Sequence, residues 1–143
     1  MGKQNAKIDK VRYKELIDSV DILSINLKSL AVDNYEKSHS QKLVAHLKYS
    51  HKEYTIEGDQ LRVYPSFVLN VKEEDDDIPI FSINIKFIAI YYIKDISKYT
   101  DDYLNMFMDL SVTINVWPYG RELISSLTTR MGYPPLVIEP FKA

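Results

Sequence analysis

The sequence predicts an α+β domain with a short N-terminal helix, four strands and two C-terminal helices. Three patterns predict it: apolar residues at helical spacing near the N-terminus, alternation of apolar and polar residues through the middle, and helical spacing again after residue 100. A chain of 143 residues suffices for one domain with a buried core, and we expect residues 1–143 to form a single domain.

A short amphipathic helix is predicted over about 8–19, because apolar residues occupy the i, i+3, i+4 and i+7 positions of one helical face. These residues are Tyr13, Leu16, Ile17 and Val20. Period-two alternation then predicts a first strand around Leu23–Leu27. The polar stretch 31–41 predicts a long connection, and a second strand is expected from Leu43 to Ile56.

The third and fourth strands carry the clearest pattern. Residues 61–71 are apolar at every odd position, although Pro65 cannot donate to a ladder and marks an edge or a bulge. Residues 81–93 are also apolar at every odd position, and their even positions become apolar at Ile88, Ile90 and Tyr92. This second apolar face calls for a further covering, either a partner subunit or an apolar ligand.

Two helices are expected after the strands. Thr100 or Asp101 caps the first, which has a stripe suited to close helix–helix packing. The stripe consists of Tyr103, Phe107, Leu110, Ile114 and Trp117. Pro118 is expected to stop this helix and to start the next one, which ends at Gly132. An extended stretch, Leu136–Phe141, follows.

Composition excludes several classes of function. The net charge is -2 and the basic residues are scattered, so neither a nucleic-acid surface nor attraction to anionic membranes is expected. The chain has no cysteine, which excludes a disulfide framework and a thiolate nucleophile. The N-terminus lacks a secretory pattern and the longest apolar run, Phe87–Ile93, is too short to span a bilayer, so we expect a cytoplasmic protein without membrane insertion.

No group of residues has the spacing of a catalytic or metal site. His39, His46 and His51 do not follow a ligand pattern, and the acidic turn Glu73–Asp77 lacks the central glycine of a calcium loop. The four glycines are too far apart for a phosphate-binding loop. We therefore expect a protein that is not an enzyme and that needs no metal and no cofactor.

The C-terminal part resembles the SecB family of export chaperones. That family opens its last conserved helix with an aromatic-Pro-Tyr-Ala-Arg-Glu segment and follows the helix with a Phe-Pro-x-Leu-x-Leu-x-Pro stretch. Here the matching segments read WPYGRE at 117–122 and GYPPLVIEP at 132–140. Gly120 stands where alanine is usual. The order of strands and helix upstream also fits, so the resemblance covers about Val20–Phe141.

The resemblance implies an antiparallel four-stranded sheet packed by the two C-terminal helices. It also implies a homotetramer, assembled as a dimer of dimers through sheet edges and the long helix. The implied function is that of an ATP-independent holdase chaperone, which binds unfolded, aromatic-rich polypeptide in apolar surface grooves and is linked to protein export. Some SecB-like proteins serve toxin–antitoxin systems instead and hold an aggregation-prone antitoxin, which is the alternative function.

The sequence departs from the family at both ends. A helix precedes the first strand, which the export chaperones of Gram-negative bacteria do not typically show. The chain ends at Ala143, whereas those chaperones continue with a further helix and an acidic tail that docks on the SecA motor. The resemblance therefore leaves SecA undecided as a partner, while the holdase function does not depend on that tail. A structural or regulatory oligomer without a groove is a third class.

Two sets of residues are assigned to these functions, and burial inside the subunit is the rival role for every member. We expect the client-binding groove to be lined by Tyr35, Leu43, Ile124, Leu127, Tyr133, Leu136 and Ile138. We expect the oligomer interface to contain Tyr103, Phe107, Leu110 and Ile114.

Overall fold

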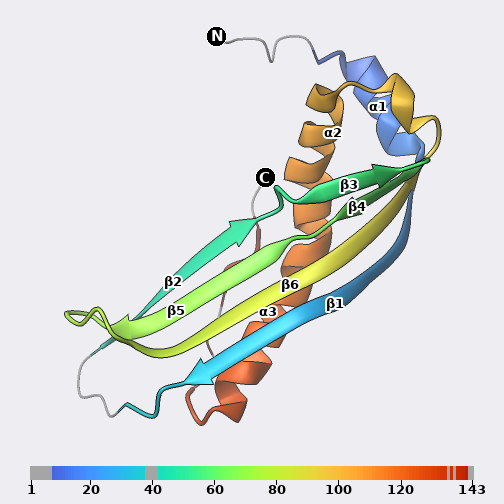
Figure 1. Ribbon diagram of the computed structural model, residues 1–143. Coiled ribbons are helices and arrows are strands. Elements are labelled where there is room, and N and C mark those ends of the chain that lie inside the picture. Colours follow the sequence, from blue (N-terminus) through green and yellow to red (C-terminus); the bar gives the residue numbers. More distant parts are fainter. Residues whose placement is uncertain (1–7, 38–41, 135, 137, 142–143) are drawn as a thin grey trace.

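The computed structural model describes residues 8–37, 42–134, 136 and 138–141. Six antiparallel strands form one curved sheet, a long helix crosses one of its faces, and a short helix lies beside the start of the long one (Figure 1). The strands are β1 Val20–Asn34, β2 Leu43–Ser50, β3 Tyr54–Glu57, β4 Gln60–Val63, β5 Ser66–Glu73 and β6 Pro79–Ile93. The short helix is α1 Lys10–Asp18, and a 3-10 turn, η2 Ile96–Lys98, precedes the long helix.

The six strands occupy four rows. Strands β4 and β5 both pair with one side of β6, β1 pairs with its other side, and β3 and β2 pair with the outer sides of β4 and β5. The expected four strands are therefore corrected to six, because two rows are interrupted. One interruption contains Pro65, whose missing N–H cannot extend the ladder and whose carbonyl accepts a bond from Phe87 N at 2.9 Å.

The first strand is longer than its sequence pattern predicts. It continues to Asn34 through the stretch expected to be a connection, because its residues pair with β6 along the whole length. Register shifts occur at Leu23 and Lys28, so the simple alternation around Leu23–Leu27 is broken there. Residues of β1 that pair with odd positions of β6 share the face of the sheet toward the helix.

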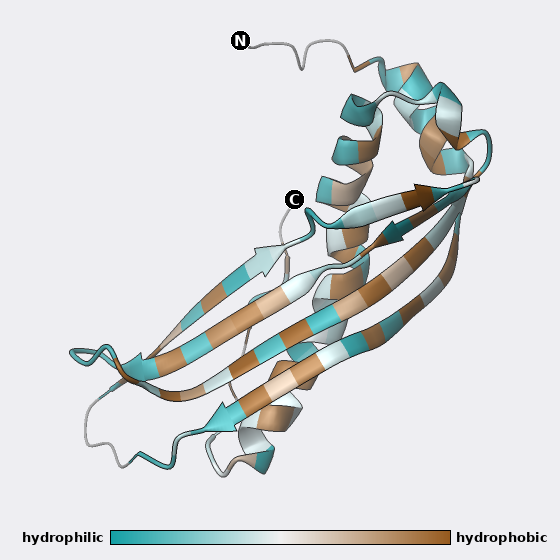
Figure 2. Cartoon of the chain, in the orientation of Figure 1, coloured by the Kyte–Doolittle hydropathy of each residue, from teal (hydrophilic) through white to brown (hydrophobic). Residues whose placement is uncertain are grey.

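The core lies between the sheet and the long helix. The odd positions from Leu61 to Val71 and from Phe81 to Ile93 are all buried, which confirms the alternation predicted for these segments. Figure 2 shows the resulting bands of hydrophobic residues along β5 and β6. The even positions of β6 lie on the opposite face, where Ile88 and Ile90 are half-buried and Tyr92 is exposed.

The two predicted C-terminal helices are one helix of 30 residues, Asp101–Arg130. It comprises α2 Asp101–Phe107, a π-helical segment η3 Met108–Val112 and α3 Thr113–Arg130. The expectation that Pro118 stops the helix is wrong. Pro118 lies on the exposed side, while Val116 and Ile124 on either side of it are buried against the sheet. Their burial offsets the roughly 3 kcal/mol that a proline costs inside a helix.

The long helix buries every fourth residue over most of its length. The buried positions in this row are Leu104, Met108, Val112, Val116, Gly120, Ile124 and Thr128. A regular α-helix repeats every 3.6 residues, so a row of period four winds around the helix. The wider turn of the π segment takes up part of this difference and keeps the row on the twisted sheet.

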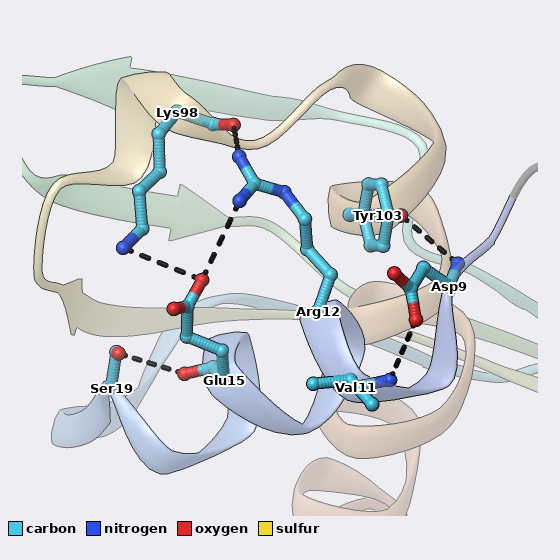
Figure 3. Close-up of polar contacts among 7 residues, drawn as sticks. All are labelled: Asp9, Val11, Arg12, Glu15, Ser19, Lys98 and Tyr103. Carbon is cyan, nitrogen blue, oxygen red and sulfur yellow. Dashed lines mark hydrogen bonds and ion pairs between the residues drawn. The ribbon is translucent and has the colours of Figure 1, made fainter.

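The N-terminal helix α1 forms where the sequence predicts it, but only Tyr13 and Leu16 of the predicted stripe turn inward, because Ile17 is exposed and Val20 begins β1. Polar contacts join its start to the long helix and to η2 (Figure 3). Asp9 caps it by accepting a bond from Val11 N, and Asp9 N donates to the hydroxyl of Tyr103 at 3.0 Å. Arg12 donates to Lys98 O at 2.6 Å. Leu16 is fully buried beneath the helix.

Helix α3 lies close to the sheet at Gly120. A Cβ atom at this position would lie 2.6 Å from the ring of Phe67, which is closer than real Cβ contacts. The ring cannot move aside easily, because Tyr49, Phe87 and Trp117 pack around it with centroid distances of 5.0, 6.0 and 5.4 Å. The packed ring of Phe67 therefore leaves no room for a side chain at position 120.

Gly120→Ala is expected to destabilise the protein by about 1–3 kcal/mol, because overpacking against Phe67 exceeds the roughly 1 kcal/mol that alanine gains in helix propensity. Urea denaturation followed by circular dichroism measures the change. Thr129→Ala, on an exposed position of the same helix, should stay within about 0.5 kcal/mol of the parent. Phe67→Leu should relieve the clash, so the double variant would lose less than the sum. A more stable Gly120→Ala protein would refute the close contact.

A chain of hydroxyl groups joins β2 to the π segment. Thr113 Oγ1 lies within hydrogen-bond distance of Met108 O, at 3.2 Å, and of the Tyr49 hydroxyl, also at 3.2 Å. Burial raises the pKa of Tyr49 to about 12, and the bond with Thr113 opposes part of this rise. The folded state thus holds the phenol proton more tightly than the unfolded state does.

Alkaline pH is expected to destabilise the protein through Tyr49. A raised folded-state pKa gives stability that is complete below the ordinary tyrosine value of 10.0 and is lost as the pH rises toward about 12. Tyr49→Phe should therefore reduce the fall in the urea midpoint across this window. Tyr119→Phe, at an exposed tyrosine, is the matched control. Equal pH dependence in Tyr49→Phe and in the parent would contradict the assignment.

Candidate functional site

A groove lies where the β2 edge of the sheet meets the C-terminal end of α3. It is a hollow of about 210 Å³, and its lining contains no charged residue. The lining residues are Leu43, Ala45, Val71, Phe81, Thr128, Tyr133, Pro134 and Leu136. The sheet provides the first four and the end of α3 provides Thr128, while the segment 133–141, which we call the tail, provides the rest.

The end of α3 positions the first aromatic residue of the tail. Gly132 has a φ of 92°, a left-handed conformation that suits glycine and reverses the chain. Tyr133 N then donates to Thr128 O at 3.2 Å, and the Tyr133 ring stacks on Phe81 at 4.8 Å with an interplanar angle of 27°. The Tyr133 hydroxyl also donates to Asn34 Oδ1 at 3.4 Å. These contacts close one end of the groove.

Residues 138–141 of the tail run back along α3. Arg121 Nε donates to Ile138 O at 2.8 Å, and Trp117 Nε1 donates to Glu139 O at 2.7 Å. The Phe141 ring lies 5.8 Å from that of Trp117. Two side chains of one helix thus hold two consecutive carbonyls of the tail.

A second hollow, the outer hollow, lies between α3 and the tail. It measures about 280 Å³. Its lining residues are Pro118, Arg121, Glu122, Ser125, Leu136 and Ile138. Leu136 lines this hollow and the groove, so the tail separates the two. The outer hollow is more polar, since Arg121 and Glu122 belong to it.

The structure separates the residues predicted for the groove. Leu43, Tyr133 and Leu136 line it together, whereas Ile138 lines the outer hollow. Leu127 is half-buried against the core. Ile124 is fully buried inside the subunit and supports the helix from beneath.

Tyr35 lies on the other face of the sheet. Its hydroxyl is 3.5 Å from Ser82 Oγ, and Ser82 alternates along β6 with Phe81 and Ile83, which face the helix. Half of the surface of Tyr35 is exposed. Tyr35 therefore does not share a surface with Leu43 in the part of the chain that the structure describes.

Several groove residues were missed by sequence reasoning. Val71 and Phe81 belong to the odd face of their strands, and the pattern indicates burial there without distinguishing a groove wall from the core. Ala45 follows Leu43 by two residues and so lies on the same face, a signal that was available. Thr128 and Pro134 carry no sequence signal for a groove.

The residues predicted for the oligomer interface also fall into two groups. Tyr103 and Phe107 are buried within the single chain, against α1 and β6. Leu110 is half-buried, and Ile114 is half exposed. The regular heptad spacing assumed for this stripe is interrupted by the π segment, and burial continues at Val112 within that segment and at Val116 after it.

The site offers apolar surface and no reactive group. Within the described residues, no group of three histidines, aspartates or glutamates is placed to hold a metal ion. The described helices include none that is long and apolar enough to cross a membrane. What the groove can do chemically is to bury apolar side chains of an extended chain.

Comparison with known proteins identifies the same family that the segments 117–122 and 132–140 resemble. The family described as "Preprotein translocase subunit SecB" matches residues 18–142. The "Protein-export protein SecB" of Wolbachia pipientis is 29% identical over 72 residues, which are 49% of this chain and 42% of the relative. That of Bartonella quintana is 28% identical over 72 residues, 50% of this chain and 44% of the relative. The alignments thus span less than half the length of these relatives.

One solved structure is similar over almost the whole chain. It is a SecB-like chaperone of Mycobacterium tuberculosis, in complex with a ChAD peptide from an antitoxin, and it has a TM-score of 0.82 at 19% identity. The match covers 92% of this chain and 98% of that one, which shows that the two share a fold. The SecB family is a family of chaperones and not of enzymes. With a family match over most of its length, the chain belongs to the SecB family.

Proposed function

We propose that the protein is an ATP-independent holdase that binds extended apolar segments of non-native polypeptide in the groove. The observation that carries this proposal is an uncharged hollow of about 210 Å³ between the β2 edge and the tail, in a member of a chaperone family. Each Å² of apolar surface that a client buries there contributes about 25 cal/mol. We also propose a cytoplasmic location for this holdase.

An antitoxin is the client class that we favour. The support comes from the similar structure of the Mycobacterium tuberculosis chaperone, whose bound peptide is part of an antitoxin. Genes for a toxin and its antitoxin beside this gene would support this client. Loss of antitoxin solubility when the chaperone is absent would test it directly.

Protein export is the second candidate, because the matched relatives carry that name. The two functions differ in the partner beyond the client. Binding to purified SecA in the presence of an unfolded client would favour export, whereas no binding to SecA together with antitoxin protection would favour the toxin–antitoxin function.

We further propose that subunits assemble as a homotetramer, a dimer of dimers. Strand β1 spans 15 residues and pairs only with β6 among the described strands. Its exposed apolar side chains are Ile22, Leu23, Leu27 and Leu30. Ile114 and Tyr119 are also about half exposed on the long helix. A second subunit that covers this edge and this helix would bury the surplus apolar surface.

Ala45→Glu is expected to weaken client binding roughly tenfold, because a client would desolvate the new carboxylate. Suppression of aggregation of a denatured client at stoichiometric chaperone measures this effect. His46→Glu is the matched control, since the neighbouring residue is exposed on the opposite face of β2. Equal activity of both variants would place client binding elsewhere, and an inactive parent would refute the holdase proposal.

Leu27→Glu is expected to reduce the assembled mass, because it places a charge at the β1 edge. Light scattering at micromolar concentration measures the mass. Ile56→Glu changes an apolar residue of similar exposure on β3, at the other edge of the sheet, and should keep the parent mass. A parent protein that is monomeric would refute the tetramer, and an unchanged mass for Leu27→Glu would remove β1 from the interface.

A further inference from the structure

The segment at 117–122 carries two donors whose partners lie in the tail. Trp117 and Arg121 are four residues apart and thus share one side of α3. Their side chains donate to Glu139 O at 2.7 Å and to Ile138 O at 2.8 Å. Both acceptors are main-chain carbonyls, which every residue has. These two bonds therefore fix the backbone of the tail independently of which side chains residues 138 and 139 carry.

Trp117 also connects the tail to the core. Its ring lies 5.4 Å from Tyr49 and 5.4 Å from Phe67, both on the sheet, and 5.8 Å from Phe141 at the end of the tail. The indole is half-buried, so the neighbouring rings determine its orientation. The donor N–H is therefore aimed at the tail by the packing of the core.

The position of the tail determines the shape of the apolar surface beside it. Leu136 lines both the groove and the outer hollow, which together flank this stretch of the tail. With the tail in place, the surface is divided into hollows of about 210 and 280 Å³. A tail that moved away from α3 would leave the groove without its outer wall.

We propose that Trp117 and Arg121 are positioning residues for client binding, which act by holding the tail as the outer wall of the groove. This inference rests on the proposed holdase function for its effect on clients. The holding of the tail itself is a property of the chain and is measurable without any client.

Removing either donor is expected to raise amide exchange in the tail, because the Ile138 and Glu139 carbonyls would lose the bonds that hold this segment on α3. It is also expected to weaken client binding about fivefold, the usual contribution of one hydrogen bond. Trp117→Phe keeps an aromatic ring and removes the N–H. Arg121→Met keeps a long side chain at a half-exposed position and removes the guanidinium. Arg121→Lys can still donate to Ile138 O and should restore part of the binding.

Two controls separate the holding of the tail from general stability. Tyr119→Phe changes an exposed aromatic residue on the same helix, and Arg130→Met removes a guanidinium that contacts Ser126. Both should leave tail exchange and binding unchanged. Hydrogen exchange by mass spectrometry, fluorescence anisotropy with a labelled peptide of alternating Phe, Leu and Ser, and the urea midpoint are measured for all variants.

The outcomes distinguish the two proposals. Unchanged tail exchange in Trp117→Phe and Arg121→Met would overturn the holding role. Faster exchange with unchanged peptide affinity would show that the tail is not a wall of the client site. If the parent protein binds no peptide, the holdase function fails, while the exchange data still decide whether these two residues hold the tail.

Discussion

The short distance between α3 and the sheet at Gly120 is the constraint on which the contacts of α3 with the tail, and the groove beside them, depend. The missing Cβ lets the helix lie directly on the ring of Phe67. At this height Trp117 reaches both the sheet rings and the tail, and Arg121 reaches Ile138 O. The groove is then formed between the tail and the β2 edge. A single small residue thus controls a geometry that extends over four elements.

Much of the fold could be predicted, because the segments concerned are strongly periodic. The odd positions from Leu61 to Val71 and from Phe81 to Ile93 are buried as expected, and α1 forms where its apolar spacing predicts. The errors arose where tertiary contacts override a local preference. Pro118 is a helix breaker in isolation, but the burial of Val116 and Ile124 maintains the helix across it. The π segment could not be predicted either, since no residue type in Met108–Val112 is specific to a π turn.

The site was predictable only in part, for a different reason. Periodicity tells which face of an element is apolar, and it does not tell which apolar residues remain uncovered once the chain is packed. Leu43 and Leu136 line the groove, whereas Ile124, equally apolar, is buried beneath it. Tyr35 precedes β2 closely in sequence but lies on the opposite face of the sheet. These distinctions depend on how the strands, α3 and the tail pack together.

The π segment has a consequence for how this chain tolerates insertion and deletion. A π turn holds one residue more than the α-helical turn that it replaces. Deleting one residue within Met108–Val112 would make the helix locally more regular. The shortened turn would then be an ordinary α-helical turn, so the residues after it would keep nearly their present phase relative to α2. Gly120 would still face Phe67, and Trp117 would still face the tail. A deletion between Thr113 and Val116, where the helix is purely α-helical, would instead rotate these residues by about 100°. The π segment is therefore a place where this helix can lose one residue without changing the phase of its second half.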